Sequence, residues 1–270
     1  AATDVAKRLD DQKSCALTAI DIFTPSSEIL RCKLKDYCER LILKDPISHA
    51  RKIEELLWRR GFYDAVAAAK KLRRGGNWDE AEKALLSTHI QVGVGFYHHL
   101  ILRLQQECGL DLNSIVDFAF PEPAAAKGKL GSTEVQQSAL KIIHRSLVCL
   151  GDLARYKLDV DPSWDPMIAT RYYKMAISVD PTIGMPHNQL GTLAAHKNHG
   201  IDAVYHYLRC ILCSEPFEGT DGNLKRVIST NFYAGRDKAP LQRCAARLFG
   251  LLHKWDNEAS SIDKINEDCE

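Results

Sequence analysis

The segment ATRYYKMAISVDP (residues 169–181) decides the fold class of this 270-residue chain. It places a small residue, an aromatic residue, a second small residue and a proline at fixed intervals, namely Ala169, Tyr173, Ala176 and Pro181. Small side chains let two helices approach closely, an aromatic ring fills the space between them, and proline cannot continue a helix. The segment therefore predicts the second helix of a closely packed helix pair.

The same pattern returns 34 residues later, with Ala203, Tyr207 and Cys210 at the matching positions and Pro216 one place late. A period of 34 residues is typical of tetratricopeptide repeats, whose unit is a helix–turn–helix pair. A Leu-Gly dipeptide marks the first helix of each pair, at residues 190–191 and, about six residues out of register, at 150–151. Because two repeats rarely stand alone, we expect them to pack on the preceding helices in one continuous array.

The first half of the chain carries several helix start and stop signals. Thr24-Pro25 supplies an N-cap followed by proline at the first helical position, and Asp45-Pro46 repeats this signal. Asn77 followed by Glu80 has the spacing of a capping box, and Gly109 ends the helix after it. Since no segment shows strand-like alternation over several residues, the fold class is predicted to be all-α.

Two boundaries divide the predicted helices. Residues 121–131 (PEPAAAKGKLG) indicate a loop, after which helices resume at Thr133 and continue with short breaks to about Trp255. We expect residues 1–235 to form one helical domain. Residues 236–270 would add a C-terminal helix or begin a helical extension.

Composition excludes some classes of protein. Lys and Arg total 36 and Asp and Glu total 35, and a net charge of +1 argues against binding nucleic acid or membranes through bulk charge. Nine scattered cysteines, several within apolar helical patterns, suit a reducing compartment. No apolar run is long enough for a transmembrane helix, and the first residues lack the apolar stretch of a signal peptide.

The sequence offers little for metal or catalytic chemistry. His196 and His199 followed by Cys210 and Cys213 have tolerable spacing for a zinc site. However, the repeat places Cys210 at a buried packing position, so core cysteines and surface histidines are the better interpretation. No phosphate-binding glycine loop, metalloprotease helix or nucleophile elbow is present. We expect no enzyme activity, no metal and no cofactor.

Basic residues are more informative. Arg59, Tyr63 and Lys70 have the spacing of one helical face, and Arg155 and Asn188 fall where the first helix of each repeat lines the concave groove. Such a groove suits an extended peptide, with the arginine holding an anion and the asparagine the peptide backbone. The alternatives are a solvated basic face and a structural arginine; burial of Arg155 against a carboxylate such as Asp152 would favour the latter.

Several longer stretches resemble one known family. HRSLVCLGDLARYKLD (residues 144–159), RYYKMAISVDPTIGMPHNQLGTLA (171–194) and YHYLRCILCSEPFEGTDGNLKRV (205–227) are similar to the SMG/Est family of nonsense-mediated mRNA decay adaptors. HARKIEELLWRRGFYDAV (49–66) and VGVGFYHHLILRLQ (92–105) resemble the N-terminal half of the same family. The similarity runs from about Leu30 to Val227 and favours the SMG-five branch.

The resemblance implies a 14-3-3-like domain of about nine antiparallel helices, partly built from tetratricopeptide-like pairs, that binds phosphoserine peptides. The phosphate-binding Arg-Tyr pair of the family matches Arg155 and Tyr156, and its groove asparagine matches Asn188. Another basic family position falls on Tyr63, which is a departure, whereas Lys70 matches a further basic position and Arg59 or Arg60 would be a substitute cation.

The resemblance also implies partners. The expected target is the phosphorylated up-frameshift RNA helicase, and the SMG-seven paralogue is the expected heterodimer partner. We expect neither direct nucleic-acid binding nor membrane binding, and a cytoplasmic location with shuttling to the nucleus as an alternative. The competing interpretation is a tetratricopeptide-type interaction scaffold whose phosphate pocket is degenerate, as the departure at Tyr63 would allow.

Overall fold

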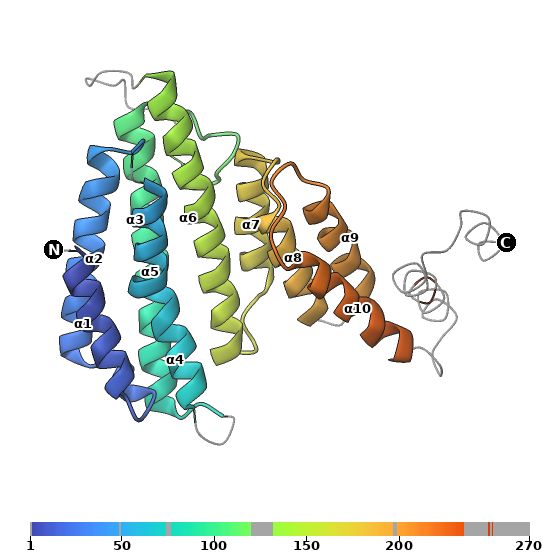
Figure 1. Cartoon of the computed structure of the whole chain (residues 1–270), viewed down its shortest axis with the longest axis horizontal. Coiled ribbons are helices and arrows are strands. Elements are labelled where there is room, and N and C mark those ends of the chain that lie inside the picture. The colour runs from blue at the N-terminus through green and yellow to red at the C-terminus, as the bar shows by residue number, and fades with distance from the viewer. Residues whose placement is uncertain are drawn as a thin grey trace. The chain divides into compact units, whose positions relative to one another are not determined.

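The computed structural model describes residues 2–48, 50–73, 77–119, 132–196, 199–234, 248 and 250. Within these residues the chain forms ten α-helices, one 3-10 helix (η1) and one π-helix (η2), and no strand (Figure 1). In chain order they are α1 (Ala2–Cys15), η1 (Ile20–Phe23), α2 (Pro25–Lys44), α3 (Ala50–Leu56), η2 (Leu57–Tyr63), α4 (Asp64–Leu72), α5 (Glu80–Cys108), α6 (Thr133–Val160), α7 (Met167–Val179), α8 (Met185–His196), α9 (Gly200–Ile211) and α10 (Thr220–Ala234). The fold is all-α, as predicted.

The chain divides into two compact units, Ala1–Asp180 with α1 to α7 and Pro181–Glu270 with α8 to α10. The single domain over residues 1–235 and the continuous array stay predictions. The helix predicted over residues 236–270 lies outside the described residues, apart from Leu248 and Gly250. The loop predicted over residues 121–131 also lies outside them.

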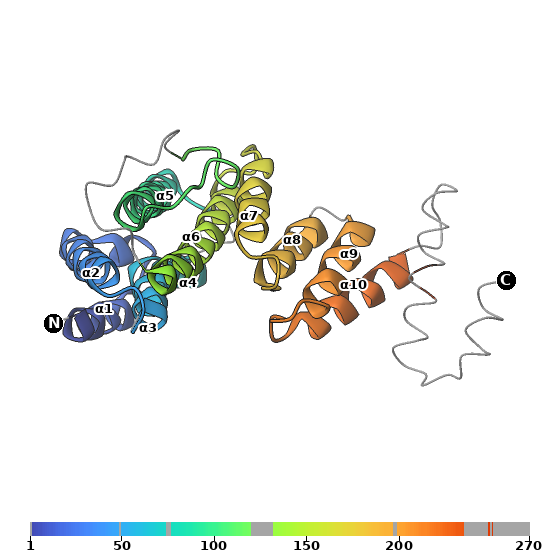
Figure 2. The ribbon, with the colours of Figure 1, turned by 90° about the horizontal axis from the view of Figure 1, so that it is seen from above.

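Helix α6 occupies the centre of the first unit. It packs against α5 on one side and α7 on the other, while α1 packs against α2 (Figures 1 and 2). Ile142, Leu147 and Leu150 of α6 are fully buried, as are Leu100 and Ile101 of α5. Because α6 packs against a helix on each side, its backbone has a fixed position, and so do the side chains that it carries.

The repeat pattern is confirmed in both units by a glycine lying against a tyrosine. In the first unit a Cβ on Gly151 of α6 would lie 2.3 Å from Cε1 of Tyr173 on α7. In the second unit a Cβ on Gly191 of α8 would lie 2.6 Å from Cε1 of Tyr207 on α9. Both tyrosines are fully buried. The glycines therefore allow the close approach that the sequence pattern predicts.

Two of the predicted helix start signals are wrong. Asp45 does not begin a helix: its carboxylate accepts hydrogen bonds from the backbone N–H groups of Ile47 and Ser48, which closes a turn, and α3 begins at Ala50. The capping box is formed by Asp79 and Glu82 instead of Asn77 and Glu80.

Other boundaries agree with the sequence. The side chain of Thr24 accepts the Ser27 N–H at the start of α2, and Ser132 caps α6 before its first residue Thr133. Gly109 ends α5 with a φ of 64°, a conformation that glycine adopts readily. Local capping chemistry therefore sets most of these boundaries.

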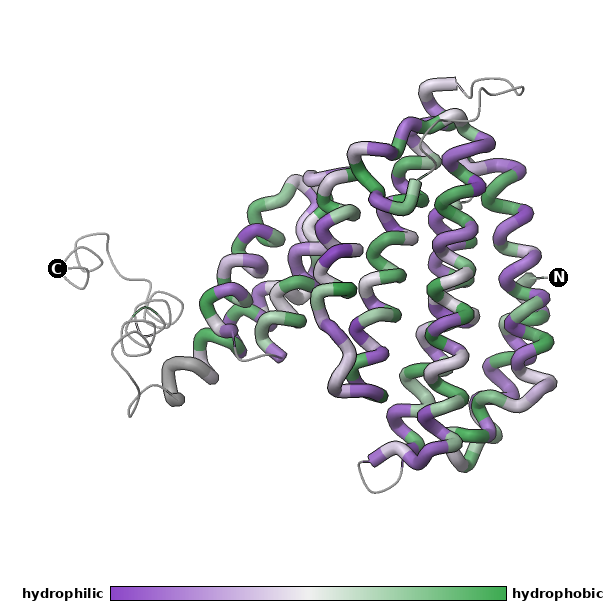
Figure 3. Tube along the Cα trace, turned by 180° about the vertical axis from the view of Figure 1, so that it is seen from behind, coloured by the Kyte–Doolittle hydropathy of each residue, from purple (hydrophilic) through white to green (hydrophobic). Residues whose placement is uncertain are grey.

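None of the described helices combines the length and hydropathy of a membrane span. Figure 3 shows hydrophobic and hydrophilic residues interspersed along the long helices. This is the pattern of helices that bury one face and hydrate the other.

Candidate functional site: an aromatic and basic cluster around Tyr156

Tyr156, near the C-terminal end of α6, is the centre of a cluster in the first unit. Its ring stacks on Trp58 of η2, with the ring centroids 6.4 Å apart and the planes at 15°. The Lys70 ammonium lies 4.5 Å from the Tyr156 ring centroid, and the Arg155 guanidinium carbon lies 4.8 Å from it. Three of the residues predicted for the site, Arg155, Tyr156 and Lys70, are therefore brought together.

Tyr156 is nearly buried, with 7% of its surface exposed. Burial and the Asp152 carboxylate raise the pKa of Tyr156 more than Arg155 lowers it. The phenol consequently stays protonated at neutral pH, and its hydroxyl retains a proton to donate.

Arg155 is held in place by a buried carboxylate. Its Nη2 lies 3.0 Å from Oδ1 of Asp152, and its Nε donates to the Tyr173 hydroxyl at 3.4 Å, which in turn donates to the same Asp152 oxygen at 2.7 Å. The side chains of Arg155 and Asp152 are 23% and 8% exposed. Burial lowers the pKa of Arg155, but Asp152 and Tyr173 raise it by more, so the guanidinium stays charged. This is the carboxylate pairing that favours a structural arginine.

Lys70, on α4, has a partner of its own. Its ammonium donates to a carboxylate oxygen of Asp159, and both side chains are 33% exposed. The backbone carbonyl of Asp159 separately accepts the Trp78 indole N–H at 2.9 Å. That second bond holds the end of α6 against the segment between α4 and α5 without using the Asp159 side chain.

Arg59 is not part of this cluster in the described residues. Its side chain is 59% exposed, and its ion pair is with Glu55 at 3.9 Å. The prediction that Arg59 shares a face with Lys70 used α-helical spacing, but Leu57–Tyr63 is π-helical, so that spacing does not hold across it. Tyr63, 40% exposed, lies with its ring 6.3 Å from Trp58.

Asn188 belongs to the second unit, where its side chain serves packing. Its Oδ1 accepts from Asn223 Nδ2 at 3.1 Å and from the Thr220 hydroxyl at 3.3 Å, and the residue is 4% exposed. This amide joins α8 to α10. The predicted role in holding a peptide backbone gains no support from the position of Oδ1.

The four residues of the zinc alternative do not gather into a ligand set. Within the part of the chain that the structure describes, no three His, Cys, Asp or Glu side chains are grouped to hold a metal. Cys210 is fully buried, and its sulfur lies 3.2 Å from the Thr220 hydroxyl. It therefore occupies the packing position that the repeat predicts.

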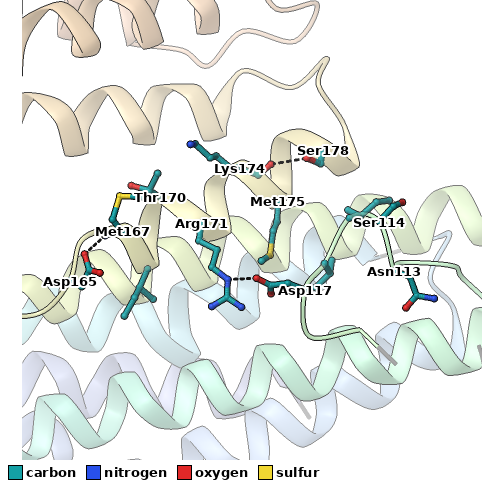
Figure 4. A pocket seen from close by; sticks show the side chains of 13 residues that line it. Asn113, Ser114, Asp117, Asp165, Met167, Thr170, Arg171, Lys174, Met175 and Ser178 are labelled. Atoms are coloured by element: carbon teal, nitrogen blue, oxygen red, sulfur yellow. Dashed lines mark hydrogen bonds and ion pairs between the residues drawn. The ribbon is translucent and has the colours of Figure 1, made fainter. Parts of the chain in front are cut away.

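A separate cleft of about 650 Å³ lies between α7 and the segment that follows α5 (Figure 4). Arg171 of α7 crosses to the carboxylate of Asp117 there, beside Met167 and Met175. None of the predicted site residues lines this cleft.

Sequence reasoning missed Trp58 and Asp159. The stacking of Trp58 on Tyr156 and the ion pair between Lys70 and Asp159 join positions far apart in the chain. No local pattern contains such contacts. The pairing of Asp152 with Arg155, in contrast, could be anticipated, because residues three apart on a helix are neighbours.

The architecture defines a class of protein: an all-α protein with tetratricopeptide-like helix pairs in both of its units. Two family models match the sequence, "Telomerase activating protein Est1" over residues 52–161 and "Est1 DNA/RNA binding domain" over residues 169–236. The nonsense-mediated mRNA decay factor SMG5 of Danio rerio is 38% identical over 77% of this chain, and that of Homo sapiens is 36% identical over 86%. The chain belongs to the SMG/Est1 family, as its motifs predict.

The chain corresponds to only part of each relative, and two solved structures share its fold. The chain spans 19% of the Danio rerio SMG5 and 23% of the human one. The structure of the C. elegans SMG5–SMG7 complex matches with a TM-score of 0.62 and 14% identity, covering 93% of this chain and 58% of that one. The crystal structure of Est1 and Cdc13 matches with a TM-score of 0.59 and 18% identity, over 98% and 52%. These neighbours share the helical 14-3-3-like and tetratricopeptide-like fold.

Proposed function

We propose that this chain is a phosphoserine-peptide-binding adaptor in nonsense-mediated mRNA decay. The relatives named above are decay factors. The single observation that carries the proposal is the convergence of Arg155 and Lys70 on the Tyr156 ring, at 4.8 Å and 4.5 Å. Two neighbouring residues of α6 and a lysine of α4 thus bring two cations and a phenol together, the kind of group that recognises a phosphate.

The chemistry suits a phosphorylated side chain. Phosphoserine carries a charge of about −1.5 to −2 and three acceptor oxygens. Arg155 donates through Nη2 and Nε within the protein, and its side chain remains 23% exposed, so a phosphate can reach part of its fork. Each charge-assisted hydrogen bond to the phosphate contributes roughly 1.5–3 kcal/mol. An unmodified serine supplies no charge for these cations, which is how the site would discriminate.

The partners follow from the family. The proposed target is the phosphorylated up-frameshift RNA helicase, and the proposed heterodimer partner is an SMG7 relative, as in the solved C. elegans SMG5–SMG7 complex. The chain would act by recruitment without catalysis, cofactor, membrane or direct nucleic-acid binding. Its proposed location is the cytoplasm, with nuclear shuttling as the alternative.

A second candidate function is a tetratricopeptide-type scaffold with a degenerate phosphate pocket. The ion pairs that Arg155 makes with Asp152 and Lys70 with Asp159 favour it, because both cations already have carboxylate partners. In this case the chain would work mainly through its heterodimer partner.

Matched phosphorylated and unmodified helicase peptides separate the two functions. By isothermal titration calorimetry, we expect the wild type to bind the phosphorylated peptide and Arg155→Glu to lose at least a hundredfold in affinity, about 2.7 kcal/mol. Lys70→Met should disturb the fold less than Arg155→Glu does, because the Lys70 side chain is one-third exposed. Arg40→Glu is the control, since its side chain is 75% exposed on α2.

The circular dichroism spectrum of each variant should match that of the wild type, so that lost binding is not lost folding. Equal affinity of the wild type for both peptides would overturn the phosphopeptide proposal and favour the scaffold.

A further inference from the structure

The two cations beside Tyr156 are held in different ways. The carboxylate that pairs with Arg155 is 8% exposed and also accepts from Tyr173. A buried charge pair of this kind is strongly destabilising to break, because it leaves an uncompensated charge. Arg155 is therefore fixed in one orientation, and Asp152 is its positioning residue.

Lys70 is held more weakly. It and Asp159 are each one-third exposed, and surface ion pairs contribute only about 0–1 kcal/mol. Water reaches both side chains, and the lysine stem has several rotatable bonds. The Lys70 ammonium can therefore leave Asp159 for another anion without leaving a buried charge behind.

We propose that Asp159 limits the affinity of the phosphate site by competing for Lys70. This inference rests on the proposed phosphopeptide function. A phosphate that docks beside Tyr156 must take Lys70 from the Asp159 carboxylate, and it then faces that carboxylate as a like charge. Asp152 and Asp159 consequently have opposite effects on binding. Asp152 orients Arg155 toward the ligand, whereas Asp159 competes with the ligand for Lys70.

Substituting each carboxylate by its amide tests this contrast. Asp159→Asn removes the charge and keeps both the volume and the backbone carbonyl that accepts from Trp78. The full 270-residue chain is titrated with a terminally blocked Ala-phosphoserine-Ala peptide and its unmodified counterpart. We expect Asp159→Asn to tighten phosphopeptide binding up to about fivefold and Asp152→Asn to weaken it.

Two further measurements separate competition from a structural effect. The gain in Asp159→Asn should shrink between 50 mM and 500 mM salt, because screening weakens exposed charges. In a Lys70→Met background the gain should fall, because the contested cation is gone. An equal gain in both backgrounds would contradict capture of Lys70 by Asp159.

The two hypotheses fail in different ways. If wild type and variants all bind the phosphorylated and unmodified peptides equally, the phosphopeptide function itself is wrong. If the wild type prefers the phosphorylated peptide but Asp159→Asn binds it no more tightly, only the role of Asp159 is wrong.

Discussion

Replacing Gly151 by alanine is expected to destabilise the first unit by about 3 kcal/mol or more. A Cβ at this position would lie 2.3, 2.6 and 2.8 Å from three ring carbons of Tyr173. The ring cannot move aside freely, because Tyr173 is fully buried and its hydroxyl donates to Asp152 at 2.7 Å. Overpacking a dense core costs typically 1–3 kcal/mol and occasionally more, and here the clash also disturbs a buried hydrogen bond.

Urea unfolding monitored by circular dichroism measures this effect. The matched control is Gly95→Ala on α5, where an added Cβ would meet nothing within 4 Å. Because alanine is a better helix former than glycine, the control should be neutral or up to about 1 kcal/mol more stable. Equal stability of the two variants would contradict the close packing of α6 on α7.

The clash should also reach the candidate site. Tyr173 accepts from Arg155 and donates to Asp152, so a displaced ring leaves the guanidinium less firmly oriented. The residue pattern that defines the fold is therefore the same one that positions the candidate phosphate contact.

Much of the fold was predictable because it depends on local rules. The small-aromatic-small pattern fixed the packing of Gly151 on Tyr173, and the cap at Thr24 and the stop at Gly109 depend on a few adjacent residues. The two wrong start signals, at Asp45 and Asn77, show the limit of this approach. The Asp45 carboxylate closes a turn instead of starting a helix, and Asp79, two residues after Asn77, provides the cap of α5.

The site was predictable only in part. Arg155, Tyr156 and Lys70 do gather, but the carboxylate partners of the two cations decide how available they are. The π-helical segment was not predictable from spacing, and it removed Arg59 from the expected face. Contacts between distant segments and departures from α-helical geometry are properties of the packed molecule.

Replacing His144 by leucine is expected to stabilise the chain, and more at pH 5.0 than at pH 7.5. His144 lies on α6 and is 1% exposed, and neither ring nitrogen has a hydrogen-bond partner in the described structure. An unsatisfied buried polar group costs about 1–3 kcal/mol. Leucine is of similar size and has no polar atom, so it should recover part of this at pH 7.5.

The pH dependence follows from the pKa of the imidazole. Burial lowers the pKa of His144 to about 4 in the folded chain, against 6.5 when unfolded. As the pH falls below 6.5, His144 becomes protonated in the unfolded state but stays neutral in the folded state. The free energy of unfolding therefore decreases on acidification. By pH 5.0 this loss amounts to about 2 kcal/mol. Leucine binds no proton, so that loss is absent from the variant.

Urea unfolding of wild type and His144→Leu at both pH values provides the comparison. His196→Gln is the control: this side chain is exposed at the end of α8, so its replacement should change stability little at either pH. The acid sensitivity of the variant should fall without vanishing, because burial also lowers the pKa of His89 to about 3. A leucine variant that is less stable than the wild type at both pH values would show that the imidazole makes a contact the protein needs.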